Sequence, residues 1–158
     1  MTELYQLGIH ALSGLIAHRK ISVLELTDAL IARCSALDEL TCAFITPMFG
    51  TARETARPRD AELANGQLRG PLHGIPIGLK DAIDVAEIQT RLCGTYMPVL
   101  HAEVWQSLDA AGAVLMGKLH CASYCLGAPG TGDLIPFARH PVDPACTPGA
   151  SSLHVSVT

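Results

Sequence analysis

The segment Gly70–Asp81 constrains the fold of this chain more than any other part of the sequence. It reads Gly-Pro-Leu-His-Gly-Ile-Pro-Ile-Gly-Leu-Lys-Asp, so glycines and prolines are interspersed with aliphatic residues before a lysine. This composition is unusual, and its last part predicts an extended strand over 75–80. The three aliphatic side chains of that strand share one face, because alternate residues point to opposite faces. Lys80 lies on the other face, with the small residue Gly78 beside it.

Hydrophobic periodicity around this segment predicts helices that alternate with strands. Ser22 and Glu25 are spaced as a capping box, in which each side chain binds a free backbone N–H at the other residue, so a helix should begin there. Apolar residues then recur at helical spacing as far as Leu37. Proline removes a helix donor, so Pro58 should break or restart the helical pattern of 51–65. The other expected elements are strands at 42–45 and 113–116, a helix at 102–112 and a helical stretch after Lys118 that reaches Gly127.

This alternation predicts an α/β layer architecture, with a mixed sheet and helices on its faces. A chain of 158 residues is long enough for one compact domain or part of one. Residues 128–158 are rich in Pro, Gly, Thr and Ser and have little periodicity, so we expect a long loop there. An α/β chain whose last segment is such a loop, with no closing helix or strand, is more typical of a fragment than of a finished fold.

Composition and charge exclude several classes of function. Hydrophobic residues make up 49% of the chain and charged residues 16%, which indicates a globular protein rather than a disordered one. The net charge of −4, without a Lys/Arg cluster, argues against nucleic-acid binding. No apolar run approaches the roughly 18 residues that a membrane span requires. The N-terminus lacks the character of a signal peptide, so we expect a cytoplasmic protein whose six cysteines are reduced thiols.

Two short segments carry candidate chemistry, and each has a simpler alternative. A lysine with small neighbours at a strand end can be partly desolvated and act as a base, as we expect for Lys80. The alternative is an ordinary solvated lysine. The segment Thr147–Ser152 presents two hydroxyls in a turn of small residues, for which the alternative is an ordinary Ser/Gly loop. Neither segment decides between its two interpretations alone.

Three segments taken together closely resemble the amidase-signature family. They are Gly70–Asp81, the Ala-Gly-Ala-Val-Leu-Met-Gly-Lys of 111–118 and the His-Pro-Val-Asp-Pro-Ala-Cys-Thr-Pro-Gly-Ala-Ser-Ser of 140–152. The resemblance covers nearly the whole chain, because the helix expected at 22–37 and the strand expected at 42–45 are also similar to the family's opening segment. It implies an incomplete amidase-signature-type fold.

The resemblance implies a serine hydrolase that acts on a small-molecule carboxamide through a Ser-Ser-Lys triad, without a metal or an organic cofactor. Lys80 matches the triad lysine, and Ser151 matches the bridging serine, which relays a proton between that lysine and the attacking serine. Asp81 and Ser152 are possible supporting residues, and for Asp81 a turn-capping role is an equal alternative. A serine hydroxyl is a weak nucleophile, so an oriented base must take its proton during the attack. Backbone N–H groups must then stabilise the oxyanion.

In the family, the attacking serine and the oxyanion hole lie at positions that would fall after Thr158. The family pattern stops at Ser152, and Leu153-His154 stands where a glycine pair is expected. We therefore expect residues 1–158 to be the N-terminal part of a single amidase-signature domain, truncated after the Ser-Ser loop, with 153–158 as an unrelated tail. Such a chain should be inactive alone. The alternative is a non-catalytic protein that binds a partner, complements a separate C-terminal chain or forms a homo-oligomer.

Three other features have less demanding interpretations. Ser156 is a candidate substitute nucleophile, but we expect terminal disorder in its unpatterned segment. His120, Cys121 and Cys125 suggest a metal site, yet no further ligand pair with zinc spacing accompanies them, so core thiols are expected instead. Lys118 is expected to be structural or solvated rather than catalytic.

Overall fold

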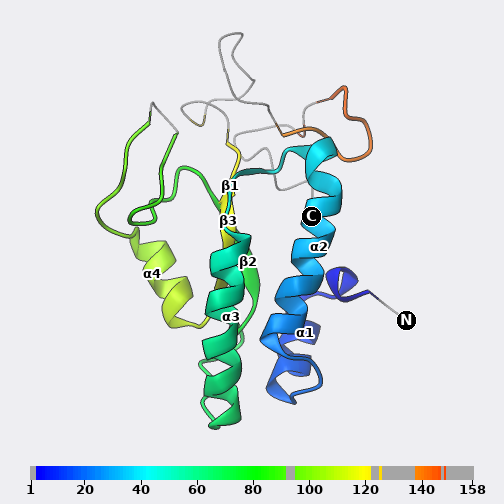
Figure 1. The fold of residues 1–158 in the computed structure, drawn as a ribbon, viewed down its shortest axis with the longest axis vertical. Coiled ribbons are helices and arrows are strands. Elements are labelled where there is room, and N and C mark those ends of the chain that lie inside the picture. Colours follow the sequence, from blue (N-terminus) through cyan, green and yellow to red (C-terminus); the bar gives the residue numbers. More distant parts are fainter. Residues whose placement is uncertain (1–2, 92–94, 122–124, 126–137, 147, 149–158) are drawn as a thin grey trace. The chain divides into compact units, whose positions relative to one another are not determined.

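Figure 1 shows the fold of the chain as a computed structural model. The structure describes residues 3–91, 95–121, 125, 138–146 and 148. In chain order, its elements are η1 (Leu4–Gln6), α1 (Ile9–Ala17), α2 (Val23–Thr41), β1 (Phe44–Pro47), α3 (Phe49–Ala64), β2 (Pro76–Lys80), α4 (Glu103–Ala110) and β3 (Val114–Leu119).

The strands form a three-stranded sheet in the order β1-β3-β2, and β1 pairs antiparallel with β3. β2 and β3 run in the same direction. Near their starts, Val114 N donates to Ile75 O at 2.9 Å, and at their ends Asp81 N donates to Leu119 O at 2.9 Å. The sheet is therefore mixed. Since helices alternate with the strands along the chain, the predicted α/β class is confirmed.

The chain divides into two compact units. Unit 1 comprises Met1–Cys34, Met48–Ile77 and Gln106–Met116, and unit 2 comprises Ser35–Pro47, Gly78–Trp105 and Gly117–Thr158. The apolar core of unit 1 consists of Leu12, Ile16, Val23, Leu26, Ile31, Ala52, Ala56, Leu63, Ile75, Ala113, Val114, Leu115 and Met116. The buried apolar side chains of unit 2 include Ala43, Leu79, Val85, Trp105, Leu119 and Ala138.

Gly74 explains part of the glycine content of the segment that leads to β2. It has a φ of +74°, in the left-handed region that favours glycine. A Cβ at this residue would lie 2.3 Å from Val23 Cγ2. Both the backbone conformation and the close contact therefore require glycine where the chain packs against the start of α2.

The start of α2 is capped by its own residues and by α3. Ser22 N donates to Glu25 Oε2 at 2.7 Å and Glu25 N donates to Ser22 Oγ at 3.0 Å, so the predicted capping box is confirmed. The carboxylate of Asp60, on α3, accepts hydrogen bonds from Val23 N at 2.7 Å and from Leu24 N at 3.1 Å. Each N–H group from residue 22 to residue 25 thus has a side-chain acceptor, although the first turn of a helix leaves such groups without intrahelical partners.

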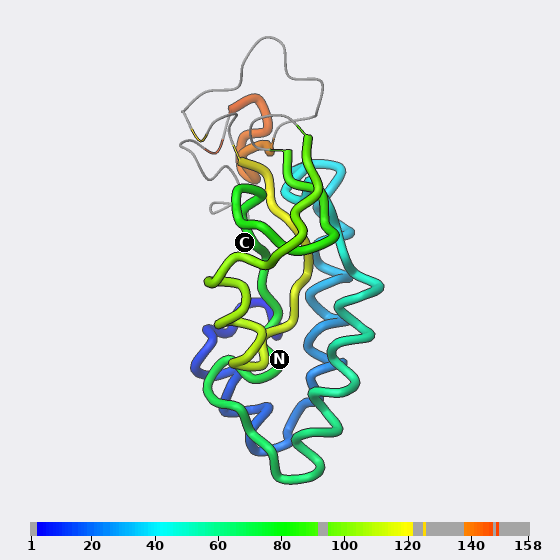
Figure 2. Tube along the Cα trace, turned by 90° about the vertical axis from the view of Figure 1, so that its left-hand side faces the viewer, coloured from blue at the N-terminus to red at the C-terminus, as the bar shows by residue number. Residues whose placement is uncertain are grey.

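The end of α3 is capped in return by the turn before α2. Arg19 Nη2 donates to Leu63 O and, at 3.1 Å, to Ala64 O, which are C-terminal carbonyls of α3. Arg19 itself has a φ of +53°, which is uncommon for a residue other than glycine. α3 and the first part of α2 therefore cap one another, and the two views agree that they lie side by side (Figure 2).

The prediction that Pro58 breaks or restarts the helix is wrong. α3 is continuous from Phe49 to Ala64 with Pro58 inside it, although a proline in a helix interior costs about 3 kcal/mol. One face of the helix is buried along its length, at Ala52, Ala56, Arg59 and Leu63. Packing of this face outweighs the local penalty.

Other elements match the expected ones with shifted bounds. α2 continues past Leu37 to Thr41, and the strand expected at 42–45 begins only at Phe44, because Cys42 has a φ of +47°. The strand expected at 113–116 continues to Leu119, so Lys118 lies within β3 instead of preceding a helix. The described part of the chain contains no helix that is long and apolar enough to cross a membrane.

Several expectations concern residues outside the described part of the chain. Ser151, Ser152 and the segment 153–158, which includes Ser156, lie there, as do most residues of the helix expected to reach Gly127. The same holds for most of the loop expected at 128–158. These expectations stay predictions.

Candidate active site at the end of strand β2

Lys80 is the last residue of β2 and is half-buried. Its neighbour Gly78 contacts β3 closely, since a Cβ at residue 78 would lie 2.4 Å from Leu119 Cδ1. The small residue expected beside Lys80 therefore has a packing reason. Ile83 N donates to Lys80 O at 2.9 Å, so the chain turns directly after the strand.

Asp81 follows Lys80 and is fixed by its backbone and its side chain. Its N–H donates to Leu119 O at 2.9 Å, which extends the pairing of β2 with β3 by one residue. Its Oδ2 accepts a hydrogen bond from Arg91 N at 2.7 Å. The side chain is only 1% exposed, and Oδ1 accepts no hydrogen bond from the described residues. A buried carboxylate in this state requires a nearby positive charge.

Lys118 supplies that positive charge. It lies on β3 opposite Thr46 of β1, its side chain is fully buried, and its Nζ is 3.4 Å from Asp81 Oδ1. The same Nζ donates to Asp81 O at 3.0 Å and to Thr90 Oγ1 at 3.3 Å. Lys118 is therefore structural, as one of the two expected alternatives held, and not solvated. Its pairing with Asp81 was not predicted from the sequence, where the signal was a lysine inside the apolar run 113–119.

The hydrogen bonds continue from Thr90 to the loop that follows. Thr90 Oγ1 donates to Asp84 Oδ1 at 2.9 Å, and Tyr96 Oη donates to the same oxygen at 2.7 Å. Thr90 and Tyr96 also exchange backbone hydrogen bonds of 3.0 and 3.1 Å. The hydrogen bond to Asp84, together with burial and the charge of that carboxylate, raises the pKa of Tyr96, so its hydroxyl remains a donor at neutral pH. One connected polar network thus joins Asp81, Asp84, Thr90, Arg91, Tyr96 and Lys118.

The thiol of Cys121 belongs to the same region but is not a reactive group. Burial, followed by the negative charge of Asp81, raises its pKa to about 11. The thiolate is the nucleophile and the metal ligand, so this thiol is inert at neutral pH. In the described residues, no group of three or more His, Cys, Asp or Glu side chains is arranged to hold a metal ion. Cys121 and Cys125 are free thiols of intermediate burial.

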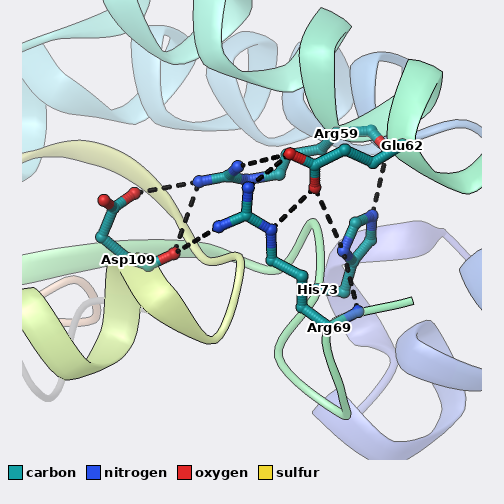
Figure 3. A network of polar contacts seen from close by, with 5 residues as sticks. All are labelled: Arg59, Glu62, Arg69, His73 and Asp109. Carbon is teal, nitrogen blue, oxygen red and sulfur yellow. Dashed lines mark hydrogen bonds and ion pairs between the residues drawn. The ribbon is translucent and has the colours of Figure 1, made fainter. Parts of the chain in front are cut away.

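Unit 1 contains a second polar network, which fixes the segment leading to β2 (Figure 3). Glu62 on α3 forms ion pairs with Arg59, at 3.1 Å, and with Arg69. Arg59 Nη2 also binds Asp109 Oδ1 on α4 at 2.9 Å. The hydrogen bond from Arg69, with the charges of both arginines, lowers the pKa of Glu62.

His73 completes this network as a buried side chain. Arg69 N donates to His73 Nδ1 at 3.4 Å, so Nε2 carries the proton and donates to Arg59 O at 3.0 Å. Both ring nitrogens are thereby used in structural hydrogen bonds. The network has the composition of a catalytic cluster, but its contacts hold the segment 69–73 against α3 and α4.

Of the residues that the sequence analysis assigned to the site, the described structure contains Lys80 and Asp81. Lys80 is the last residue of β2 and Asp81 directly follows it. The Asp81 side chain contacts Lys118 and the backbone N–H of Arg91. Ser151 and Ser152 lie outside the described residues, so their distance from Lys80 is not part of this geometry.

Comparison with known proteins identifies the family. The family model described as amidase matches residues 25–152. The chain belongs to the amidase family. The match includes all three segments on which the predicted resemblance depends, and that prediction is confirmed.

Comparison with individual relatives shows how much of an amidase this chain covers. A glutamyl-tRNA(Gln) amidotransferase component from Roseiflexus castenholzii is 38% identical over an alignment 156 residues long that covers 96% of this chain and 32% of the relative. The peptide amidase from Stenotrophomonas maltophilia is 27% identical with a TM-score of 0.77, over 92% of this chain and 32% of that one. A fatty acid amide hydrolase structure, at 22% identity and a TM-score of 0.88, shares the fold over 98% of this chain and 28% of its own. The chain thus spans about a third of the length of these relatives.

Proposed function

We propose that residues 1–158 form the part of an amidase active site that carries the general base. In this proposal Lys80 is the base, Ser151 relays the proton, Asp81 and Ser152 support them, and the substrate is a carboxamide. The observation that carries the proposal is the setting of Lys80. This lysine is half-buried at a strand end, and the next residue is fixed by a fully buried ion pair. The family match, which includes Lys80 and Ser151, supports the same assignment.

The proposed reaction is hydrolysis of the amide to carboxylate and ammonia. An attacking serine oxygen bonds to the amide carbon while its proton passes through the Ser151 hydroxyl to Lys80 Nζ. The C–N bond then breaks, and the departing nitrogen takes the proton back and leaves as ammonia. Water attacks the remaining ester in the same way and gives a proton to Lys80. Lys80 returns this proton through Ser151 to the departing serine oxygen, which restores the serine, and the acid loses its own proton to solvent and leaves as the carboxylate.

The attacking serine and the oxyanion hole are not assigned to residues 1–158, because the family places both at later positions. We therefore propose that these residues do not hydrolyse amides without a polypeptide that supplies both groups. Exposed apolar side chains of unit 2 support such a partner. Tyr96, Met97, Val99 and Leu100 are between 48% and 86% exposed within five residues, and apolar side chains gathered on a surface are typical of interaction sites.

Complementation tests this function. The chain is mixed with the part of the Roseiflexus castenholzii relative that follows the matched region, and ammonia release from simple carboxamides is measured. We expect activity in the mixture and none in either part. Loss of a general base typically costs 10²–10⁴-fold, so Lys80→Met should lower the rate by at least about 100-fold.

Lys20→Met is the matched control, because Lys20 is exposed and lies in unit 1. Its mixture should retain the full rate. Equal activity of the Lys80→Met and Lys20→Met mixtures would contradict the role of Lys80 as the base. Activity of the unmixed chain that depends on Lys80 would contradict the need for a partner.

A further inference from the structure

The residue after Lys80 is fixed at more points than a strand end normally is. Two consecutive residues of β3 bind Asp81: Leu119 O accepts its N–H, and Lys118 Nζ donates to its carbonyl oxygen. Lys118 also pairs with its carboxylate, and Arg91 N donates to that carboxylate from the other side. The peptide groups on both sides of Asp81 and its side chain are thus held.

We propose that Lys118 is a positioning residue that acts through Asp81 to set the direction of the Lys80 side chain. The proposal rests on the proposed function of Lys80 as the base. Lys118 does not contact the reacting atoms in this scheme. It holds the backbone from which Lys80 emerges, so that the amine of Lys80 stays in one place.

Lys118 is the residue on which this arrangement depends, because its charge compensates the buried carboxylate. Its Nζ lies within 3.0–3.4 Å of three oxygens: it donates to Asp81 O and Thr90 Oγ1 and forms an ion pair with Asp81 Oδ1. If Lys118 is replaced by an uncharged residue, the Arg91 N–H is the one donor to the carboxylate that remains among the described residues. An unpaired buried charge is strongly unfavourable, so Asp81 must move toward solvent and Lys80 must move with it.

The three lysines of the chain, Lys20, Lys80 and Lys118, allow a test by chemical labelling. Acetylation of the full chain with trace acetic anhydride is quantified at each lysine by mass spectrometry. Lys20 is exposed and serves as the internal reference. In Lys118→Met, we expect the ratio of Lys80 to Lys20 acetylation to rise about fivefold, the fold-change that corresponds to the loss of one hydrogen bond holding Asp81. An unchanged ratio in a folded Lys118→Met chain would overturn the proposal.

Arg59→Met is the matched control, because Arg59 is a buried, ion-paired cation in unit 1. It should leave the ratio unchanged, and an equal rise in this variant would mean general loosening and also overturn the proposal. If Lys118→Met does not fold by circular dichroism, Thr90→Val decides. It leaves the Lys118 charge in place and removes the 3.3 Å hydrogen bond from Nζ, together with the 2.9 Å hydrogen bond from Thr90 Oγ1 to Asp84 Oδ1. A rise in the ratio supports the proposal, and no change refutes it. Labelling requires no amide hydrolysis, so failure of the amidase function and failure of the positioning role give different results.

Discussion

Asp60→Ala is expected to destabilise the chain by about 3 kcal/mol. The Asp60 carboxylate accepts two hydrogen bonds, from Val23 N at 2.7 Å and Leu24 N at 3.1 Å, and hydrogen bonds to charged groups are each worth about 1.5–3 kcal/mol. Asp60 is half-buried, so water can replace part of the two lost hydrogen bonds. The total cost therefore stays near the lower limit of their summed energies. Ser22→Ala removes a single exposed cap of the same helix and should cost only about 1 kcal/mol.

The assay is urea unfolding followed by circular dichroism at the helical band, with the free energy of unfolding compared among variants. Asp28→Ala is the matched surface control, because Asp28 pairs with Arg53 at 2.6 Å but both side chains are more than 40% exposed. It should change the free energy by less than about 1 kcal/mol. If Asp60→Ala costs no more than Ser22→Ala, the capping of α2 by α3 contributes nothing and the reasoning is refuted.

Three further predictions follow from other contacts. The folded pKa of Glu62 lies below its ordinary 4.5, so the stability lost in Glu62→Gln should be largest above pH 4.5 and should shrink as the pH falls through the folded pKa, as urea unfolding at several pH values can show. Because burial raises the Cys121 pKa from 9.0 to about 11, iodoacetamide should alkylate this thiol about 100-fold more slowly at pH 8 in the native chain than in urea, and equal rates would contradict that pKa. Gly117→Ala should cost about 3 kcal/mol or more in unfolding free energy, because its φ is +150° and the new Cβ would lie 2.4 Å from the Thr46 carbonyl oxygen, whereas Gly50→Ala in open space on α3 should be neutral or stabilising by up to about 1 kcal/mol.

Local chemistry explains which parts of the fold the sequence predicted. The capping box of Ser22 and Glu25 depends on residues three positions apart, so its pattern was sufficient to place the start of α2. The strand that ends at Lys80 was visible from its alternation. Pro58 was misjudged, because the packing that keeps α3 continuous involves residues distant in the sequence and leaves no local pattern.

In the candidate site, too, local features were predicted and contacts between distant residues were not. Lys80 was found from its motif and its small neighbour. The pairing of Asp81 with Lys118 was missed, because it joins residues 37 positions apart whose contact depends on the register of β2 and β3. Residue type does not tell a buried lysine from an exposed one, because burial depends on how the whole chain folds.

The reciprocal capping of α2 and α3 has a consequence for how the chain folds. The first turn of α2 needs the Asp60 carboxylate, and the last turn of α3 needs the Arg19 guanidinium. Most of the stability of a helix in a protein comes from tertiary packing, so neither helix is expected to persist before the other is present. The two should form together in the transition state, and substitutions at Asp60 and Arg19 should slow folding more than they speed unfolding.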